Sequence, residues 1–123
     1  VKAYAESFVK AVFTPESFTK RVEAVEKIKG IIQSNSSIGI CGALLALASR
    51  TDTTEALVGI KVPTLILVGK NDTLTPPSAS QQMRSKITDA EIHIIPDAAH
   101  MSNLENTEQF NKHLLNFLRK LGS

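Results

Sequence analysis

The sequence predicts an α/β fold, with helices in its first half and a β-α-β-α unit in its second. Residues 64–69 (TLILVG) are an unbroken apolar run, which is typical of a strand buried on both faces in a parallel sheet. Residues 91–95 (EIHII) are a second, shorter strand-like segment, and a helical pattern lies between the two. The order strand, helix, strand, helix indicates a βαβ unit with one more covering helix.

The first half is predicted to consist of helices because its apolar residues recur at helical spacing. Thr14 and Pro15 are typical of a helix start, with Thr14 as the N-cap and Pro15 at the first helical position. Gly30 is expected to end that helix. A later helix is rich in small residues, which permit close packing against a neighbour or a ligand. We expect these helices over residues 3–13, 15–30, 37–49 and 55–58.

In the second half, a turn-rich loop over residues 70–77 follows the first strand and leads into a helix. Residues 96–103 are expected to be loop, and the last helix carries an apolar stripe from Phe110 to Leu121. A strand that is apolar on both faces requires a neighbour on both edges, and two parallel strands do not make a stable sheet. We therefore expect the 64–69 strand to present an exposed edge that belongs to a larger sheet.

The composition is that of an ordinary globular chain, with 42% hydrophobic and 21% charged residues. With 14 basic and 12 acidic residues, the formal net charge of +2 favours neither nucleic acid nor a membrane surface as a partner. No apolar run approaches the ~20 residues of a membrane span. The single cysteine, Cys41, allows no internal disulfide, and this agrees with the cytoplasmic location that we expect.

Two side chains follow the carboxyl ends of the two predicted strands, where parallel sheets carry their sites. Asp72 comes after the first strand and His100 after the second, so both are expected at the same edge of the sheet. A carboxylate there can accept the Nδ1 proton of the imidazole and stabilise the imidazolium during proton transfer. This pair would be two thirds of a nucleophilic triad. The alternative for Asp72 is turn chemistry, since Asn-Asp is ordinary loop composition.

The other candidates have simpler interpretations. His93 lies within the second strand and is expected to be structural or partly exposed, His113 lies on a polar helix face, and Cys41 is expected to be buried. No set of His, Cys and acidic residues has the spacing of metal ligands, and the glycines form no phosphate-binding loop, so we expect neither metal nor cofactor. The nucleophile elbow G-x-S-x-G is absent from the sequence.

Residues 60–77 (IKVPTLILVGKNDTLTPP) closely resemble the acid-bearing strand and loop of α/β-hydrolases. Residues 94–105 (IIPDAAHMSNLE) resemble the histidine loop of that family, and residues 110–118 resemble its closing helix. The resemblance implies that Asp72 is the triad acid and His100 the general base. Two departures are the Asp-Ala-Ala before the histidine, where glycines are common, and Asn106, which stands in place of a proline and can cap the last helix.

The resemblance implies that residues 1–60 are lid helices and a linker, and that residues 61–123 hold the last two strands of the hydrolase core. Residues 38–52 resemble the end of the lid in members similar to 3-oxoadipate enol-lactonase. The family order of nucleophile, acid and histidine places the serine upstream of Val1. The first hypothesis is therefore the C-terminal fragment of a hydrolase for a small carboxylic ester or enol-lactone, inactive alone. Dehalogenase, haloperoxidase and acyltransferase relatives remain open.

The second hypothesis is a non-catalytic oligomerising or interaction module derived from the same fold. Its basis is the unpaired edge of the 64–69 strand, against which an identical chain could pair. A two-fold axis would set the two copies of this strand antiparallel and give a four-stranded sheet. On this hypothesis the protein is a homodimer.

Overall fold

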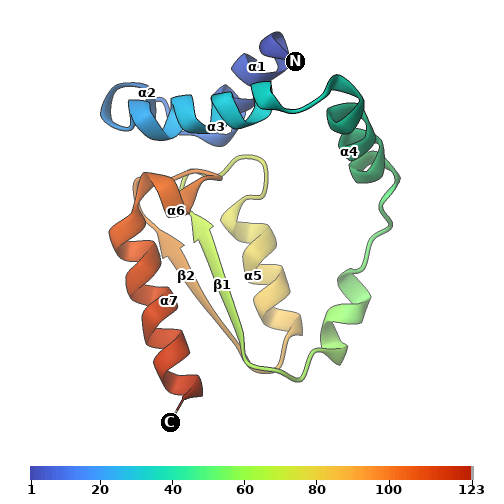
Figure 1. Ribbon diagram of the computed structural model, residues 1–123. Helices are drawn as coiled ribbons and strands as arrows, with labels where there is room; N and C mark the ends of the chain where they lie inside the picture. The colour runs from blue at the N-terminus through green and yellow to red at the C-terminus, as the bar shows by residue number, and fades with distance from the viewer. Residues whose placement is uncertain (123) are drawn as a thin grey trace.

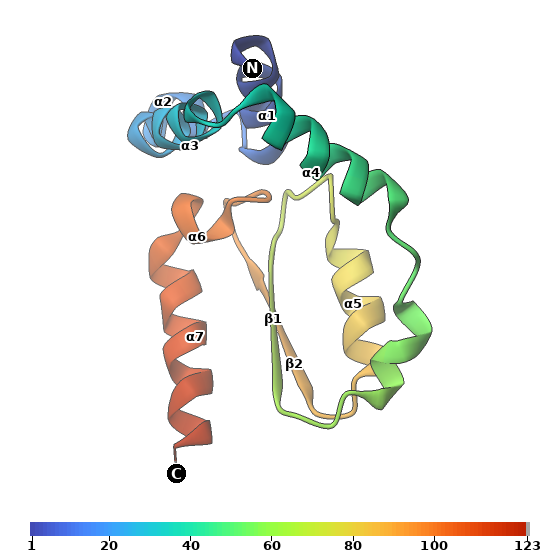
Figure 2. The same cartoon turned by 45° about the vertical axis from the view of Figure 1, so that its right-hand side comes forward.

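The computed structural model describes residues 1–122, and its two strands form a parallel pair as the sequence predicts. In the register of β1 (Thr64–Gly69) and β2 (Ala90–Ile95), Thr64 lies opposite Ala90 and Gly69 opposite Ile95. The helices α5 (Pro77–Lys86) and α7 (Thr107–Leu121) lie on opposite sides of the strands (Figures 1 and 2). The predicted α/β class and the β-α-β-α order are confirmed.

The core of this half lies between the strands and α5. Ile66 of β1, Ala90 of β2 and Ile87, which follows α5, are buried together. The short helix η1 (Thr54–Gly59) packs against α5, where the Glu55 carboxylate lies 2.9 Å from Lys86 Nζ. On α7, Asn106 accepts a hydrogen bond from the N–H of Gln109 at 3.3 Å, so the expected cap is present.

The first helices, α1 (Lys2–Val12), α2 (Ser17–Lys20) and α3 (Val22–Ser34), lie across the carboxyl ends of the strands (Figure 1). Their core consists of four buried side chains, and Met101 and Leu104 of the segment after β2 pack against it. The four are Val9, Val12, Phe13 and Val25. The helices therefore cover the edge at which Asp72 and His100 are expected. The division into residues 1–60 and 61–123 stays a prediction.

The single helix expected over residues 15–30, with Thr14 as its N-cap, is wrong at its start, in its middle and at its end. The first helical residue is Ser17, and Glu16 is at the N-cap position without a side-chain hydrogen bond. The chain breaks at Arg21, which has φ −135° and ψ 37°, so two helices form in its place. Gly30 lies inside α3 and does not take the left-handed conformation in which glycines commonly end helices. The helix ends at Asn35, where the side chains of Ser34 and Asn35 both donate hydrogen bonds to the Ile31 carbonyl.

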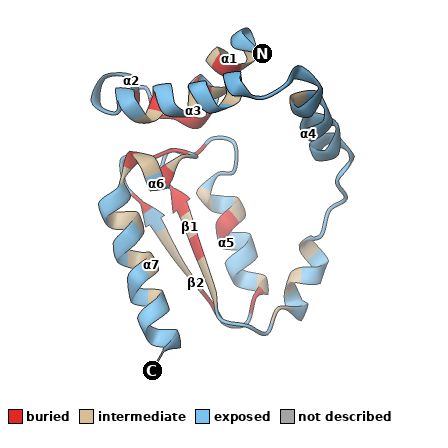
Figure 3. Ribbon diagram, in the orientation of Figure 1, coloured by how far each residue is buried: buried red, intermediate tan, exposed pale blue. Residues whose placement is uncertain are grey.

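The helix α4 (Ser37–Ser49) forms where expected, and Ser36 Oγ caps it by accepting the N–H of Gly39 at 3.0 Å. None of its residues is buried, however (Figure 3). Ile38 is 84% exposed. Cys41 is exposed, so the prediction of a buried thiol is wrong. The composition of α4 is typical of a helix that packs closely, but the described part of the chain supplies no neighbour to cover it.

Two further expectations change in detail. Part of the loop expected over residues 96–103 is the helical turn α6 (Ser102–Glu105), in which the N–H groups of Leu104 and Glu105 bond to the Met101 carbonyl. His113 stacks on His93, with ring centroids 3.9 Å apart, so it is half-buried and does not lie on a solvated face. Burial lowers the pKa of His113, and the neighbouring His93 and Lys112 lower it further.

No single helix of the described residues is long and apolar enough to cross a membrane. The helices α3 and α4 meet that length and composition only when they are taken together, and the chain bends by 102° between them.

Candidate active site

Asp72 lies in the turn after β1 and is only 6% exposed. Its Oδ1 accepts the backbone N–H of Leu74 at 2.9 Å and that of Thr75 at 3.0 Å. An aspartate that bonds to N–H groups two and three residues ahead is a common device for ordering a turn. Asp72 therefore orders its own turn, the alternative role considered for it, through Oδ1 alone. Its second oxygen, Oδ2, is left for another partner.

That second oxygen faces His100. Although the two residues are 28 positions apart in the chain, His100 Nδ1 lies 2.8 Å from Asp72 Oδ2. They meet because β1 and β2 are adjacent and parallel, so the loops after both strands emerge at one edge. The imidazole is 37% exposed, and within residues 1–122 its Nε2 has no hydrogen-bond partner. The ring is thus held at one nitrogen and open at the other.

Thr75 completes this arrangement and was not singled out from the sequence. Its hydroxyl donates to Asp72 Oδ2 at 2.9 Å, and the same oxygen lies 3.2 Å from His100 Nδ1. Because the hydroxyl proton points to the carboxylate, the threonine oxygen can accept part of the Nδ1–H bond. The sequence feature that indicates Thr75 is the spacing Asp-x-x-Thr, because the side chain of an aspartate can accept the N–H of the residue three positions ahead.

The electrostatics keep Asp72 ionised. Burial of Asp72 raises its pKa, but hydrogen bonds from the Thr75 N–H, from His100 and from the Thr75 hydroxyl outweigh this effect, so the pKa lies below its ordinary value of 3.8. An ionised Asp72 favours the tautomer of neutral His100 that carries its proton on Nδ1. The lone pair is then on Nε2, which can accept a proton from a group above the ring.

The lowered pKa of Asp72 predicts an acid-sensitive contribution to folding. Because the folded-state pKa is below the unfolded value, this contribution is complete above about pH 4 and is lost as the pH falls through the folded-state pKa. The free energy of unfolding of the wild type should therefore decrease more steeply below pH 4 than that of Asp72→Asn. Urea titrations of both proteins from pH 6 to pH 2.5 measure this difference, and parallel curves would contradict the prediction.

The loop that carries His100 runs directly against the end of β1. A Cβ added to Gly69 would lie 2.0 Å from the Ala99 carbonyl oxygen and 2.5 Å from that of Ala98, so only glycine fits there. The N–H of Asn71 donates to the Ala98 carbonyl at 2.9 Å. Asp97 has φ 53°, in the left-handed region that glycine favours and that aspartate tolerates better than most residues. This explains how an Asp-Ala-Ala segment can replace glycines before the histidine.

A second acid, Glu105, lies buried behind the histidine loop and was not singled out as a site residue. Its carboxylate accepts the N–H of Ala99, the residue before His100, at 2.6 Å. No spacing in the sequence indicates this role, because its other partners lie near residue 15.

Among the described residues, no group of three or more His, Cys, Asp and Glu side chains could hold a metal ion.

The parallel strands, the helices on both sides and a histidine held by an aspartate at the carboxyl edge define the class of α/β-hydrolase folds. The family model described as serine aminopeptidase, S33, matches residues 13–107. The chain therefore belongs to this α/β-hydrolase family, and the resemblance seen in the sequence is confirmed.

Solved structures agree with this assignment. An esterase from Thermogutta terrifontis superposes with a TM-score of 0.91 at 32% identity, over 98% of this chain and 44% of the esterase. The enol-lactonase from Burkholderia xenovorans gives a TM-score of 0.87 at 25% identity, over 95% of this chain and 44% of the lactonase.

Among curated proteins, the 2-hydroxy-6-oxononadienedioate/2-hydroxy-6-oxononatrienedioate hydrolase of Escherichia coli is 39% identical over 64 residues. The match covers 52% of this chain and 22% of that hydrolase. The chain thus spans less than half the length of each of these relatives.

Proposed function

We propose that this chain is the C-terminal half of a serine-type α/β-hydrolase that acts on a small carboxylic ester or enol-lactone. The observation that carries the proposal is the 2.8 Å contact of His100 Nδ1 with the buried Asp72, which leaves Nε2 open. The similarity to an esterase and an enol-lactonase supports the substrate class. In this proposal His100 is the general base and Asp72 is the acid that orients it.

The reaction follows from the two nitrogens of His100. Nε2 takes the proton of a serine hydroxyl as the serine oxygen bonds to the ester or lactone carbonyl. Asp72 stabilises the imidazolium that forms, and Thr75 keeps the carboxylate in place. Nε2 then gives the proton to the leaving oxygen, which yields an acyl-enzyme. Water, deprotonated by the same nitrogen, adds to the acyl carbon. Nε2 then gives this proton to the serine oxygen as its bond to the acyl carbon breaks, which releases the acid and restores the serine hydroxyl.

The serine is not provided by these 123 residues, which contain no G-x-S-x-G segment. We therefore expect the chain alone to be inactive and to lack a reactive serine. The test compares the purified chain with the product of the longer open reading frame. Each is treated with a fluorophosphonate probe, which labels activated serines, and assayed with p-nitrophenyl acetate.

Labelling and turnover are expected only for the longer protein, with the probe on the serine of a G-x-S-x-G segment. The control for contaminating esterases is His100→Ala in both proteins, prepared in the same way. Hydrolysis by the 123-residue chain that disappears in its His100→Ala variant would contradict the proposal. An upstream reading frame without a nucleophile elbow would contradict it as well.

A second candidate function, a non-catalytic interaction module, is favoured by one specific observation. Within the described residues β1 pairs with β2 alone, so its other edge is free for another strand. We propose that an identical chain pairs there, antiparallel across a two-fold axis, to form a homodimer. Sedimentation velocity over a concentration series should show a dimer. A folded monomer at every concentration would rule this pairing out.

We also propose a cytoplasmic location. Cys41 is exposed and forms no disulfide, and a free surface thiol is best preserved in a reducing compartment. Cell fractionation should recover the protein with cytoplasmic enzymes, and recovery from the medium would contradict this location.

A further inference from the structure

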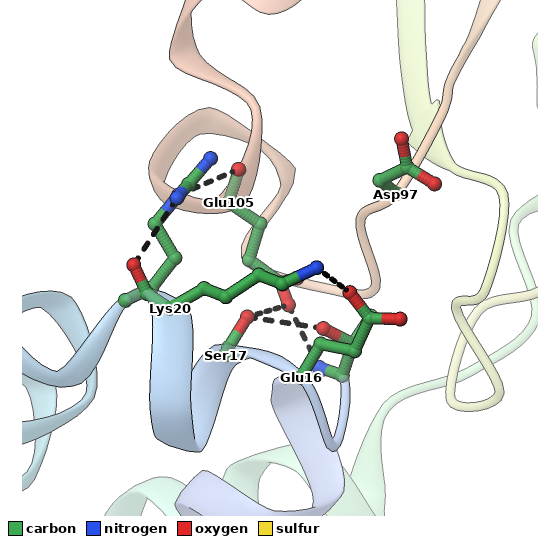
Figure 4. A pocket seen from close by; sticks show the side chains of 7 residues that line it. Glu16, Ser17, Lys20, Asp97 and Glu105 are labelled. Atoms are coloured by element: carbon green, nitrogen blue, oxygen red, sulfur yellow. Dashed lines mark hydrogen bonds and ion pairs between the residues drawn. The ribbon is translucent and has the colours of Figure 1, made fainter.

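The reaction described above makes no use of Glu105, although this carboxylate is only 2% exposed. It lies at the end of α6 and is hydrogen-bonded to the turn that joins α1 to α2. Glu105 lines a cavity of about 370 Å³. Figure 4 shows it close to Ser17 and apart from Asp97. A buried carboxylate is costly to hold unless its oxygens are hydrogen-bonded, so its partners indicate why it is there.

Glu105 has three donors, and they come from two separate parts of the chain. Oε1 accepts the backbone N–H of Thr14 and the hydroxyl of Ser17, both at 2.7 Å. Oε2 accepts the N–H of Ala99 at 2.6 Å. Both oxygens are therefore acceptors, and each faces a different segment: the α1–α2 turn on one side and the histidine loop on the other.

Other contacts join the same two segments. The N–H of Met101, the residue after His100, donates to the Val12 carbonyl at 3.2 Å. Arg21 Nε donates to the backbone carbonyl of Glu105 at 3.1 Å. The loop is thus hydrogen-bonded to the first helices both before and after His100 in the chain. Its Ala98 and Ala99 carbonyls also lie close against Gly69, the last residue of β1. Among the described residues, Glu105 is the one side chain that bonds to both segments through its carboxylate.

We propose that Glu105 is a positioning residue for His100. It holds the peptide N–H before the histidine and ties it to the α1–α2 turn, so that the placement of the first helices sets the contact of His100 with Asp72. This inference rests on the proposed function only for the role of His100 as a base. The coupling itself is a property of the described residues.

The test uses the 123-residue chain and observes the His100 ring directly by ¹H–¹⁵N NMR at low temperature. In Glu105→Gln an amide NH₂ replaces one acceptor oxygen and faces a donor, either the Ala99 N–H or the Thr14 and Ser17 pair. The hydrogen bonds to that segment are then lost, so the side chain no longer joins the α1–α2 turn to the histidine loop. The Nδ1–H proton should move upfield, and its exchange with solvent should accelerate by about tenfold, the factor for one hydrogen bond.

Three further variants separate positioning from general stability. Glu6→Gln makes the same chemical change on α1, at a half-exposed residue paired with Lys29, and should leave the His100 signals unchanged. Ile87→Val removes one methyl group from the other core and should lower stability without moving these signals. Ser17→Ala removes one donor from Oε1 and should give a smaller shift in the same direction as Glu105→Gln.

Unchanged His100 signals in a folded Glu105→Gln variant would overturn the proposal. An equal change in Ile87→Val would do the same, because it would make the effect one of stability alone. If Glu105→Gln does not fold, Ser17→Ala decides: a shift supports the coupling and no shift overturns it. No substrate is used, so a longer protein without hydrolase activity would contradict the proposed function and leave this result standing.

Discussion

Replacement of His100 by alanine is expected to lower the kcat of the nucleophile-containing protein by roughly 10⁴-fold or more, the scale found when a triad base is removed. The reason is that Nε2 of this ring, held through Nδ1 by Asp72, is the group that accepts the serine proton. Substrate binding does not depend on that proton transfer, so KM should change far less than kcat. Steady-state hydrolysis of p-nitrophenyl acetate measures both constants.

The chain offers a matched control for this substitution. His113→Ala makes the same change at a histidine that stacks on His93 along β2 and α7, away from the Asp72 contact. It should keep kcat within a few-fold of the wild type even if it costs some stability. Loss of activity in His113→Ala equal to that in His100→Ala, or full activity in His100→Ala, would remove His100 from the role of base.

The second large effect is expected at Gly69, where β1 meets the histidine loop. In Gly69→Ala the new methyl group would lie 2.0 Å from the Ala99 carbonyl oxygen, and this neighbour is backbone, which cannot rotate away. The loop must move or the strand end must shift. We expect a loss of about 1–3 kcal/mol or more in the free energy of unfolding, as for other overpacked sites, measured by urea denaturation.

Gly30→Ala is the control for Gly69→Ala, because a Cβ at this position of α3 meets no atom within 4 Å. Alanine is favoured over glycine inside a helix, so this variant should gain up to about 1 kcal/mol. The two substitutions are identical in composition and should have opposite signs. Equal stability of the two variants would contradict the steric argument, and so would an unshifted His100 resonance in Gly69→Ala.

The β-α-β-α half could be predicted closely because its signals are local. An apolar run with no polar alternation identifies β1, and Asn106 caps α7 by the chemistry that its side chain carries. The first half was predicted less well. Arg21 breaks the expected helix where its side chain donates to the Glu105 carbonyl, a contact between segments 84 residues apart. Gly30 does not end the helix, which runs on to Ser34.

The residues of the candidate site also differ in how far the sequence predicts them. Asp72 and His100 could be predicted because strand order alone brings the loops after two parallel neighbours to one edge. Thr75 follows only once the aspartate is known to cap its own turn. Glu105 could not be found, because its donors Thr14 and Ser17 lie 91 and 88 residues away and no periodicity links them.

The sequence by itself determined the order of the elements, the acid and the histidine after adjacent strands, and the absence of a nucleophile elbow from these 123 residues. Only the tertiary structure decided that Nδ1 of His100 meets Asp72 at 2.8 Å, that Glu105 joins the first helices to the histidine loop, and that α4 is exposed. The physical reason is the distance along the chain over which each kind of interaction acts. Apolar spacing and capping residues act over a few positions, whereas buried hydrogen bonds and close backbone contacts depend on which distant segments pack together.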